Sequence, residues 1–411
     1  MASPADTGWV GSLAPARPSR PDPREVLPMR GSFRFLRVAG IDLRVHFTFP
    51  LVLLYGAVLW GEGHGPRGAL FGCLLMLALF ACVVLHELGH SMVARRFGIP
   101  VREIILLPIG GMALMVRTPR RPLHELIIAA AGPLVSGLLA VGFFALLAAS
   151  YPGPVLDAFQ LIDPRHGQPS GLTMLAWLST SNLMLLLFNL VPAFPMDGGR
   201  MLRAILASVL GFQRATRIAA ALGQVLAMLL GAFAVWTGNV WLAVVAVFIF
   251  IAAAQQRAGE EARGVLSSLR LGDSYNKYAL VLSPGDRVSK VVDYLLTSYQ
   301  PDFAVLHGGE LLGVVTRNVV LRALADDPTD AYVAGLMDRQ YLRLDARQSL
   351  AEAQELMAEQ SRTVAAVFAG DRYLGLINLD DLREALQIAA FLKLHEERYG
   401  GGTRLDATPA A

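Results

Sequence analysis

Two histidines and a glutamate stand at a spacing that suits metal-dependent hydrolysis. His86, Glu87 and His90 form the pattern H-E-x-x-H. On a helix, positions i and i+4 share a face, so both imidazoles can bind one metal ion while Glu87 takes a proton from a water beside it. The pattern is short enough to occur by chance, so its surroundings have to support it.

The segment that carries this motif is otherwise apolar. The motif ends the run ALFGCLLMLALFACVVL (69–85), in which each ionisable residue costs roughly 2.5–3.5 kcal/mol on insertion scales. Three such residues within five positions require a compensating partner, and a metal ion would supply it. The alternative is a pair of interfacial histidines whose side chains reach water, and that cost disfavours it.

Asp197 is the best candidate for the third protein ligand that a catalytic zinc site needs. It follows the fourth apolar segment, on the same expected side of the membrane as His90. The sequence around it, NLVPAFPMDGG (189–199), is dense in helix breakers and predicts unwound backbone, which membranes tolerate beside protein or a water-filled cavity. Taken alone, Asp197 would be a turn or helix N-cap residue ahead of Gly198 and Gly199.

The composition places these residues in a membrane protein. Of 411 residues, 54% are hydrophobic and 17% are charged, and the mean hydropathy of +0.47 excludes an ordinary soluble protein. The formal net charge of +3 comes from arginines beside apolar runs rather than from one patch, so no nucleic-acid partner is expected. Cys73 and Cys82 would lie about 13 Å apart on one helix, beyond disulfide reach.

Six apolar segments approach the roughly 17–25 residues that cross a bilayer as a helix. Residues 201–211 fit either a separate helix near the surface or part of a broken span. We therefore expect a polytopic α-helical membrane protein with about six transmembrane helices. The expected spans are residues 45–60, 69–92, 125–149, 172–191, 216–235 and 239–254.

Arginines at the ends of these spans predict their orientation, because short loops rich in Lys and Arg stay in the cytoplasm. The loops on the opposite side hold only Arg67 and Arg165. Both termini in the cytoplasm and a multi-pass arrangement in the lipid bilayer of the cell (inner or cytoplasmic) membrane satisfy every loop. The arginines assigned to the cytoplasmic side are Arg30, Arg34, Arg37, Arg44, Arg95, Arg96, Arg102, Arg117, Arg120, Arg121, Arg200, Arg203, Arg214 and Arg217.

The C-terminal part contains an internal repeat. Segments 291–324 and 353–386 each predict a helix, a strand, a turn, a strand and a helix, with Gly313 and Gly375 in equivalent places. Two α/β units are expected to pack as a pair. The expected division of the chain is a disordered leader (1–37), a membrane-embedded domain (38–256), a linker (257–276), repeat 1 (277–326), repeat 2 with a helix (327–395) and a disordered tail (396–411).

Taken together, the motifs resemble the site-2 protease family of intramembrane zinc metalloproteases. The repeat resembles a pair of cystathionine β-synthase (CBS) modules, which one branch of that family carries at its C-terminus. The family resemblance covers about residues 38–256. The segments that carry it are HELGH (86–90), LLPIGGMALM (106–115), AGPLVSG (131–137) and N-x-x-P-x-x-P-x-D-G-G (189–199).

The resemblance implies a zinc-dependent endopeptidase with one Zn²⁺ per chain. His86, His90 and Asp197 would be the metal ligands and Glu87 the general base. The substrate would be a transmembrane protein, cut within or near a transmembrane segment in regulated intramembrane proteolysis. Further substrate contacts are implied at Asn189, Gly110 and Gly111.

Two further polar residues are Ser136 and His46. Ser136 stands where the family often has Asn after A-G-P, so the polar contact made there is expected to differ. His46, just inside the first span, fits a position often occupied by His in this branch. An interfacial histidine is the better interpretation, because a fourth protein ligand would close a catalytic site.

The stretch Ile104–Met115 is expected to bind the substrate backbone. A helical substrate hides its backbone in internal hydrogen bonds and has to unwind before cleavage, and an edge strand in this stretch would pair with the unwound part. A re-entrant packing loop is nearly as good an explanation of the same residues.

The CBS resemblance implies an adenine nucleotide ligand (ATP or AMP) or a homodimer formed through the pair. Such modules commonly bind the nucleotide through a Ser or Thr and an Asp two residues later. Thr316 with Asn318, and Asn378 with Asp380, each match only in part. Thr316 and Asp380 are therefore the nucleotide-binding candidates, and neither site is complete.

Two other classes of protein share some of these features. A CBS-regulated membrane channel or transporter would explain buried polar residues as an ion pathway. It would not explain a metal-ligand spacing with a third carboxylate in a Pro- and Gly-broken segment. A catalytically inactive scaffold is disfavoured because every expected ligand and base residue is present.

Overall fold

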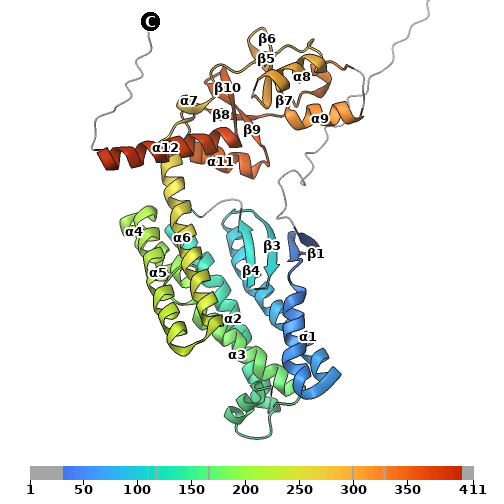
Figure 1. Cartoon of the computed structure of the whole chain (residues 1–411), viewed down its shortest axis with the longest axis vertical. Coiled ribbons are helices and arrows are strands. Elements are labelled where there is room, and N and C mark those ends of the chain that lie inside the picture. Colours follow the sequence, from blue (N-terminus) through green and yellow to red (C-terminus); the bar gives the residue numbers. More distant parts are fainter. Residues whose placement is uncertain are drawn as a thin grey trace, which may run out of the picture.

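The computed structural model describes residues 31–399 except 109, 116–118, 120, 165–166, 299 and 327–329. A helical part with a small sheet is joined to a C-terminal α/β part by one long helix, α6 (Val240–Ser268) (Figure 1). The expected fold class, a polytopic α-helical membrane protein with a C-terminal CBS pair, is confirmed. Residues 1–30 and 400–411, assigned to the leader and the tail, lie outside the described residues.

Helix α1 (Pro50–Arg96) contains two of the expected spans. It bends at Gly65, whose φ is +60°, just before Pro66, which lacks the N–H that a continuous helix needs. The limbs on either side pack together, with the fully buried Trp60 edge-on to Phe71 at 4.8 Å between ring centroids. The first span is therefore the short limb that begins at Pro50, five residues later than expected.

Five helices among the described residues are long and apolar enough to cross a membrane, and α1 counts among them once. Because the two limbs of α1 correspond to two expected spans, these five helices account for all six expected spans. The other four candidate spans are α2 (Pro122–Ser150), α3 (Gly171–Asn189), α5 (Phe212–Thr237) and α6. Two shorter helices in this part are the 3₁₀ helix η1 (Val155–Ile162) and α4 (Asp197–Leu210). Residues 201–211 fitted either a separate helix or part of a broken span. In the structure, residues 201–210 belong to a separate helix, α4.

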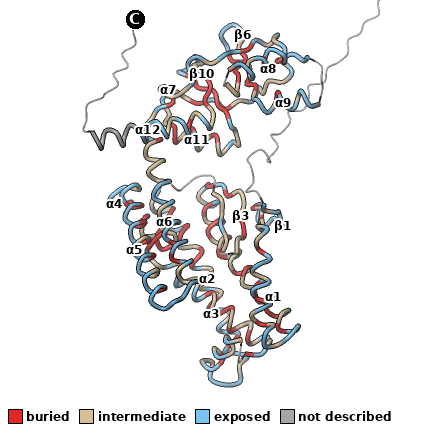
Figure 2. The backbone as a smooth tube through the Cα atoms, viewed as in Figure 1, coloured by how far each residue is buried: buried red, intermediate tan, exposed pale blue. Residues whose placement is uncertain are grey.

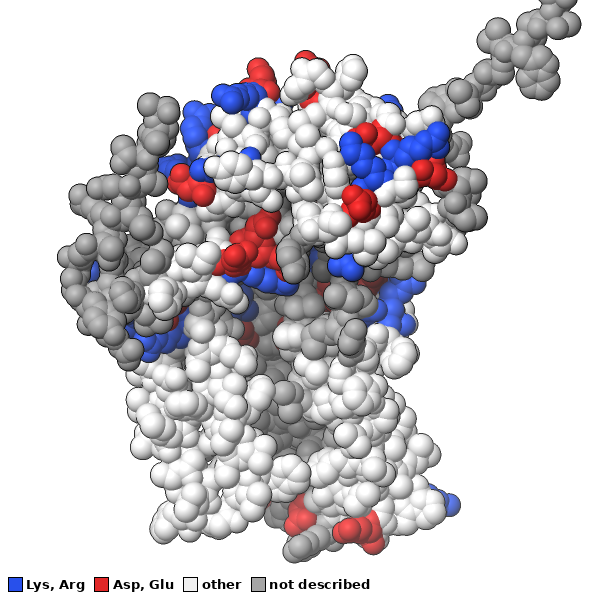
Figure 3. All heavy atoms as spheres, turned by 45° about the horizontal axis from the view of Figure 1, so that its top comes forward, with Lys and Arg blue, Asp and Glu red and all other residues white. Residues whose placement is uncertain are grey.

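The outer surface of this helical part suits lipid. The face seen in Figure 3 has a broad band without charged side chains, below a charged region that surrounds the C-terminal part. Apolar side chains are exposed on the outer helices, whose pale blue segments Figure 2 shows. Trp236 and Trp241 are each 82% exposed beside the α5–α6 turn, where aromatic side chains favour the membrane–water interface.

A four-stranded sheet lies beside α1, in the order β1 (Ser32–Val38), β2 (Ile41–His46), β3 (Val101–Leu107) and β4 (Gly110–Met115). Strands β2 and β3 are parallel, and the other pairs are antiparallel. Ile104 of β3 and Leu88 of α1 belong to one buried cluster. Among the described residues β4 pairs only with β3, so its other edge has no strand partner there.

Strand β1 corrects one prediction, because residues 32–37 were assigned to a disordered leader. This segment pairs with β2 through a turn at Ala39 and Gly40, whose φ angles are +49° and +79°. Two positive φ values form the turn type that matches the twist of a hairpin. The leader's Pro- and Arg-rich composition hid a strand that only its pairing with β2 reveals.

The C-terminal part confirms the internal repeat. Each unit is a three-stranded sheet in which the first strand is parallel to the second and the second pairs with the third as a hairpin. Gly313 and Gly375 are each the fourth residue of the last strand. A buried cluster shared by both sheets, with Val314 and Phe368, joins the units as a pair.

Repeat 1 contains β5 (Val281–Leu282), α8 (Val288–Thr297), β6 (Asp302–His307), β7 (Glu310–Thr316) and α9 (Arg317–Asp326). Repeat 2 contains β8 (Leu342–Asp345), α11 (Leu350–Glu359), β9 (Val364–Ala369), β10 (Arg372–Asn378) and α12 (Leu379–Tyr399). The short helices α7 (Leu271–Ser274) and α10 (Val333–Leu336) precede them.

Helix α6 replaces most of the expected linker. It runs from the last span to Ser268, so residues 257–268 are helical. Leu266 near its end is buried in the core of repeat 2, and Arg263 forms an ion pair with Glu355 of α11 at 2.6 Å. Burial of this end against repeat 2 explains why a charged segment stays helical after leaving the apolar region. Helix α12 likewise extends to Tyr399, four residues beyond the expected end of repeat 2.

Candidate metal centre

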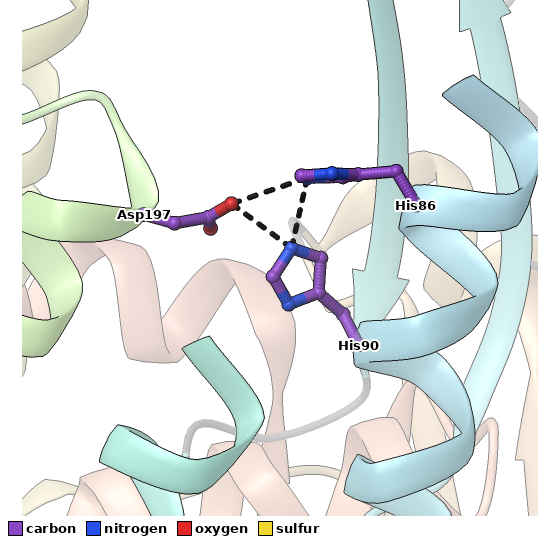
Figure 4. A group of neighbouring side chains, drawn as sticks. All are labelled: His86, His90 and Asp197. Carbon is purple, nitrogen blue, oxygen red and sulfur yellow. Dashed lines mark hydrogen bonds and ion pairs between the residues drawn. The ribbon is translucent and has the colours of Figure 1, made fainter. Parts of the chain in front are cut away.

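His86, His90 and Asp197 converge on one point between α1 and the start of α4 (Figure 4). Asp197 Oδ2 lies 3.2 Å from His86 Nε2 and 3.0 Å from His90 Nε2, and the two Nε2 atoms are 3.2 Å apart. All three residues are buried. The histidines therefore do not reach toward water, which removes the interfacial interpretation of them.

Helix α2 holds both imidazoles by their other nitrogen. His90 Nδ1 lies 2.7 Å from the backbone oxygen of Ile128 and must donate to it, because a carbonyl only accepts. His86 Nδ1 lies 2.8 Å from Ser136 Oγ. A proton on Nδ1 leaves the lone pair of Nε2 pointing at Asp197, as metal-binding histidines require. Ser136, the residue that departs from the family pattern, is thus a direct partner of His86.

The three ligand atoms fit a zinc ion. Zinc takes nitrogen and oxygen ligands at about 2.0–2.2 Å in a tetrahedron, so ligand atoms stand about 3.3–3.6 Å apart. The observed separations of 3.0–3.2 Å are only slightly shorter. Two imidazoles and one carboxylate leave the fourth position for water or substrate, which is the arrangement of catalytic zinc sites.

Gly132 permits α2 to approach the histidines so closely. A Cβ at this position would lie 2.1 Å from His90 Nε2 and 2.7 Å from His86 Nε2. Ile128, Gly132 and Ser136 repeat at four-residue intervals, so they lie on one face of α2. This face of α2 therefore supplies both a groove for the imidazoles and a hydrogen-bond partner for each of them.

Asp197 reaches the site because the chain unwinds after α3. Residues 190–196 are not helical, and α4 begins at Asp197 itself. A carboxylate in the first turn of a helix is stabilised by the helix dipole. Its second oxygen, Oδ1, faces Arg200 Nη1 at 3.6 Å, which leaves Oδ2 for the metal.

A buried ion pair fixes α4 against α2, and sequence analysis missed it. Glu125 is fully buried, and its Oε1 accepts from Arg203 Nε at 2.8 Å and also from Nη2. The Arg203 guanidinium also lies 5.3 Å from the ring centre of Phe194, in the unwound segment. Removing one partner of a buried pair typically costs about 3–5 kcal/mol. Arg203 was counted as an orientation signal, whereas it locks the helix that carries Asp197.

Glu87 stands beside the three ligands, in contact with strand β4. A Cβ on Gly111 would lie 2.6 Å from Glu87 Cγ, so glycine lets the strand come this near. The backbone N–H of Ala113, also on β4, is oriented toward the Glu87 carboxyl group. The free edge of β4 therefore faces the expected general base.

A cavity of about 720 Å³ opens at this point. Its wall includes His86, Glu87 and Asp197 together with the predicted substrate residues Asn189, Gly110 and Gly111. His46 is not part of it, because its Nδ1 bonds Thr48 Oγ1 at 2.7 Å at the end of β2. The remaining wall residues are Leu79, Phe80, Val83, Pro108, Ile162, Trp177, Thr180, Ser181, Met184, Leu185, Phe188 and Pro195.

The predicted nucleotide residues Thr316 and Asp380 are not on the wall of the cavity between the repeats. This cavity, of about 330 Å³, is lined by Asp302, Asn378 and Asp381. Asp380 is exposed and pairs with Arg383. Burial raises the pKa of Asp302 to about 6, so near neutral pH this cavity carries negative charge. Asp381, which sequence analysis did not select, is the acidic residue of repeat 2 that lines it.

Comparison with known proteins agrees with both parts of the chain. Residues 74–230 match peptidase family M50, and residues 333–388 match the CBS domain. A zinc metalloprotease of Methanocaldococcus jannaschii is 31% identical over 369 residues, which are 90% of this chain and 99% of the relative. Stage IV sporulation protein FB of Bacillus subtilis is 25% identical over 271 residues, which are 64% of this chain and 88% of the relative.

Among solved structures, a site-2 protease from Methanocaldococcus jannaschii is similar to this chain. It is 38% identical, and the match covers 55% of this chain and 95% of that protein with a TM-score of 0.42. The range matched to family M50 includes the H-E-x-x-H motif and Asp197.

The close approach at Gly132 generates a prediction about metal binding. We expect Gly132→Ala to lose zinc, because the added methyl group would occupy the space between both Nε2 atoms. Zinc per chain in the purified protein, measured by mass spectrometry, checks it. Gly142→Ala on the same helix is the control, since a Cβ there meets nothing within 4 Å. Full zinc content in Gly132→Ala would show that α2 is not packed on the histidines as described.

Proposed function

The chain belongs to peptidase family M50, and on that premise we propose that His86, His90 and Asp197 hold its catalytic zinc and that Glu87 is the general base. The protein is a zinc-dependent membrane protease with an appended CBS domain. It cuts a peptide bond within or near a transmembrane segment of a membrane protein substrate. The convergence of the three ligand atoms beside Glu87, in a cavity lined by β4 and α3, carries the residue assignment.

The chemistry divides between the metal and the chain. A zinc ion at this site supplies Lewis-acid polarisation and lowers the pKa of water. Glu87 takes the proton of the attacking water and gives it to the leaving amide nitrogen as the peptide bond breaks. Ser136 and the Ile128 carbonyl keep both imidazoles oriented through these steps, while Arg200 faces the Asp197 oxygen not assigned to the metal.

Two substitutions separate the metal role from the proton-transfer role. Glu87→Gln should retain one zinc per chain and lose about 10²–10⁴-fold in cleavage rate, because it removes only the base. Asp197→Ala should lose both zinc and cleavage. The measurements are metal content and cleavage of a model single-span substrate.

Glu62→Gln is the matched control, since Glu62 is an exposed glutamate on the same helix. It should behave like the wild type. Wild-type cleavage by Glu87→Gln would remove Glu87 from the mechanism, and full zinc in Asp197→Ala would remove Asp197 from the ligands.

The substrate backbone is proposed to pair with β4. The edge of β4 that pairs with no described strand lies beside Glu87, and the Ala113 N–H faces the Glu87 carboxyl group. An unwound substrate segment added along this edge would satisfy its own backbone groups. Asn189, Gly110 and Gly111, which line the same cavity, are the further substrate contacts in this proposal.

Removing one donor from that edge provides the test. Ala113→Pro lacks the N–H, so kcat/KM should fall at least about tenfold while zinc content stays at one per chain. Ala113→Ser keeps the N–H and should cleave within about twofold of the wild type. Equal cleavage by the proline variant would favour the packing-loop interpretation of this stretch.

The proposed location is the cytoplasmic membrane, with both termini and the CBS pair in the cytoplasm. The six expected spans and the arginines on the side of the CBS pair support this orientation. In sealed inside-out vesicles, a protease added outside should remove the CBS pair. Protection of the CBS pair under those conditions would reverse the orientation.

Regulation by the CBS pair is proposed to pass through Arg102. This β3 residue donates from Nη2 to the Ala358 oxygen at 2.5 Å and to Ser361 Oγ at 2.9 Å, at the end of α11. Strand β3 pairs directly with β4. A shift of repeat 2 would therefore move the strand that faces Glu87.

Exposed Leu296, Leu321 and Leu324 on α8 and α9 support the further proposal of a homodimer through the CBS pair, which a monomer in detergent solution would disprove.

Titration with ATP and AMP tests this coupling. If a nucleotide binds, it should change kcat/KM of the wild type by about fivefold or more. It should leave kcat/KM of Arg102→Met unchanged, although that variant should still show the heat of nucleotide binding. An equal response in Arg102→Met would exclude this route. No heat and no change in cleavage with either nucleotide would leave the CBS pair a structural role.

A further inference from the structure

The substrate cavity extends well beyond the metal centre. It follows α1 from Glu87 back to Leu79, and it follows α3 from Asn189 back to Trp177. Twelve residues of helix rise about 18 Å, so the cavity is long enough for an extended segment of several residues. Of the described residues in the sheet and its turns, the wall includes Pro108 of the β3–β4 turn and Gly110 and Gly111 at the start of β4. The deeper part of the cavity therefore has no strand along it.

An extended substrate in that deeper part needs other hydrogen-bond partners. Backbone N–H and C=O groups without partners are strongly unfavourable away from water, and a strand added to β4 uses only the groups that face β4. Of the wall residues outside the metal centre, four have polar side-chain atoms, all on α3: Trp177, Thr180, Ser181 and Asn189. The Trp177 Nε1 already donates to the Ile162 oxygen at 2.9 Å.

Thr180 has a hydroxyl group that is buried and has no hydrogen-bond partner among the described residues. Threonines elsewhere in the helices behave differently. The hydroxyl of Thr216 donates to the Phe212 oxygen at 2.8 Å, and that of Thr237 donates to the Phe233 oxygen at 2.9 Å. These bonds to the preceding turn are the usual way for a helical threonine to satisfy its hydroxyl group. Thr180, whose residue lines the cavity, lacks such a bond, so its hydroxyl group is a buried polar group that still needs a partner.

The position of Thr180 and Ser181 relative to the metal is set by packing. Trp177 and Leu178 of α3 belong to the same cluster as Leu79 and Cys82 of α1. Leu79 lies about two helical turns before His86. Thr180 and Ser181 therefore lie on the α3 wall in the part of the cavity near Leu79, away from the metal centre.

We propose that Thr180 and Ser181 form a second hydrogen-bonding wall of the substrate site, which binds the backbone of the substrate segment deeper in the membrane than the cut bond. The inference rests on the proposed function, because it requires a substrate that unwinds beside Glu87. Strand β4 holds the segment near the metal, and the hydroxyl groups of α3 hold its continuation. The substrate class is a transmembrane segment that is extended on both sides of the cleavage site.

The test compares threonine variants in the full-length protein with the single-span substrate. Thr180→Val keeps the shape and removes the hydroxyl group, so kcat/KM should fall about tenfold. Thr180→Ser keeps the hydroxyl group and should stay within about twofold of the wild type. Ser181→Ala in addition to Thr180→Val should lower kcat/KM further. Zinc content should remain at one per chain in every variant.

Thermal stability distinguishes substrate binding from a structural role. Replacing an unpartnered buried hydroxyl group by a methyl group should leave the midpoint of unfolding unchanged or raise it. Stability and kcat/KM that fall together in Thr180→Val would overturn the proposal in favour of a structural role. Wild-type kcat/KM in the double variant would also overturn it. Loss of cleavage in Glu87→Gln would still support the proposed function in either case.

Discussion

Ionisable side chains inside a membrane helix need partners within the protein, and this requirement organises the membrane part of the structure. His86 and His90 are buried on α1, so α2 and the start of α4 supply their partners. The contact demands a glycine at position 132, and it demands a break in the chain ahead of Asp197. Helix breakers that would destabilise an ordinary span thus serve to bring a carboxylate to the imidazoles.

The same rule extends from the metal ligands to their supports and to the substrate. The Glu125–Arg203 pair is buried between α2 and α4, so the helix that supplies Asp197 is tied to the helix that orients both histidines. An unwound substrate presents the same problem of unpaired polar groups. The free edge of β4 and the hydroxyl groups of α3 offer the two sets of partners that it needs.

Local sequence patterns predicted much of the candidate site. The parts that depend on contacts between distant residues could not be predicted from them. H-E-x-x-H and the Pro- and Gly-rich segment selected the three residues whose side chains converge, because spacing on a helix and unwound backbone are visible in sequence. The partnership of Ser136 with His86, and of Arg203 with Glu125, joins residues 50 and 78 positions apart. Strand β1 and the helical end of α6 escaped prediction for the same reason, since each is stabilised by a distant segment. Asp381 lines the cavity between the repeats, whereas the neighbouring Asp380 is exposed and pairs with Arg383, and the sequence alone does not distinguish them.

Anomalous X-ray scattering at the zinc absorption edge, from crystals of the purified Glu87→Gln protein, tests the central claim most directly. The account predicts one zinc peak per chain, at about 2.0–2.2 Å from His86 Nε2, His90 Nε2 and an oxygen of Asp197. A fully loaded crystal whose zinc lies elsewhere, or whose ligands omit Asp197, would contradict it.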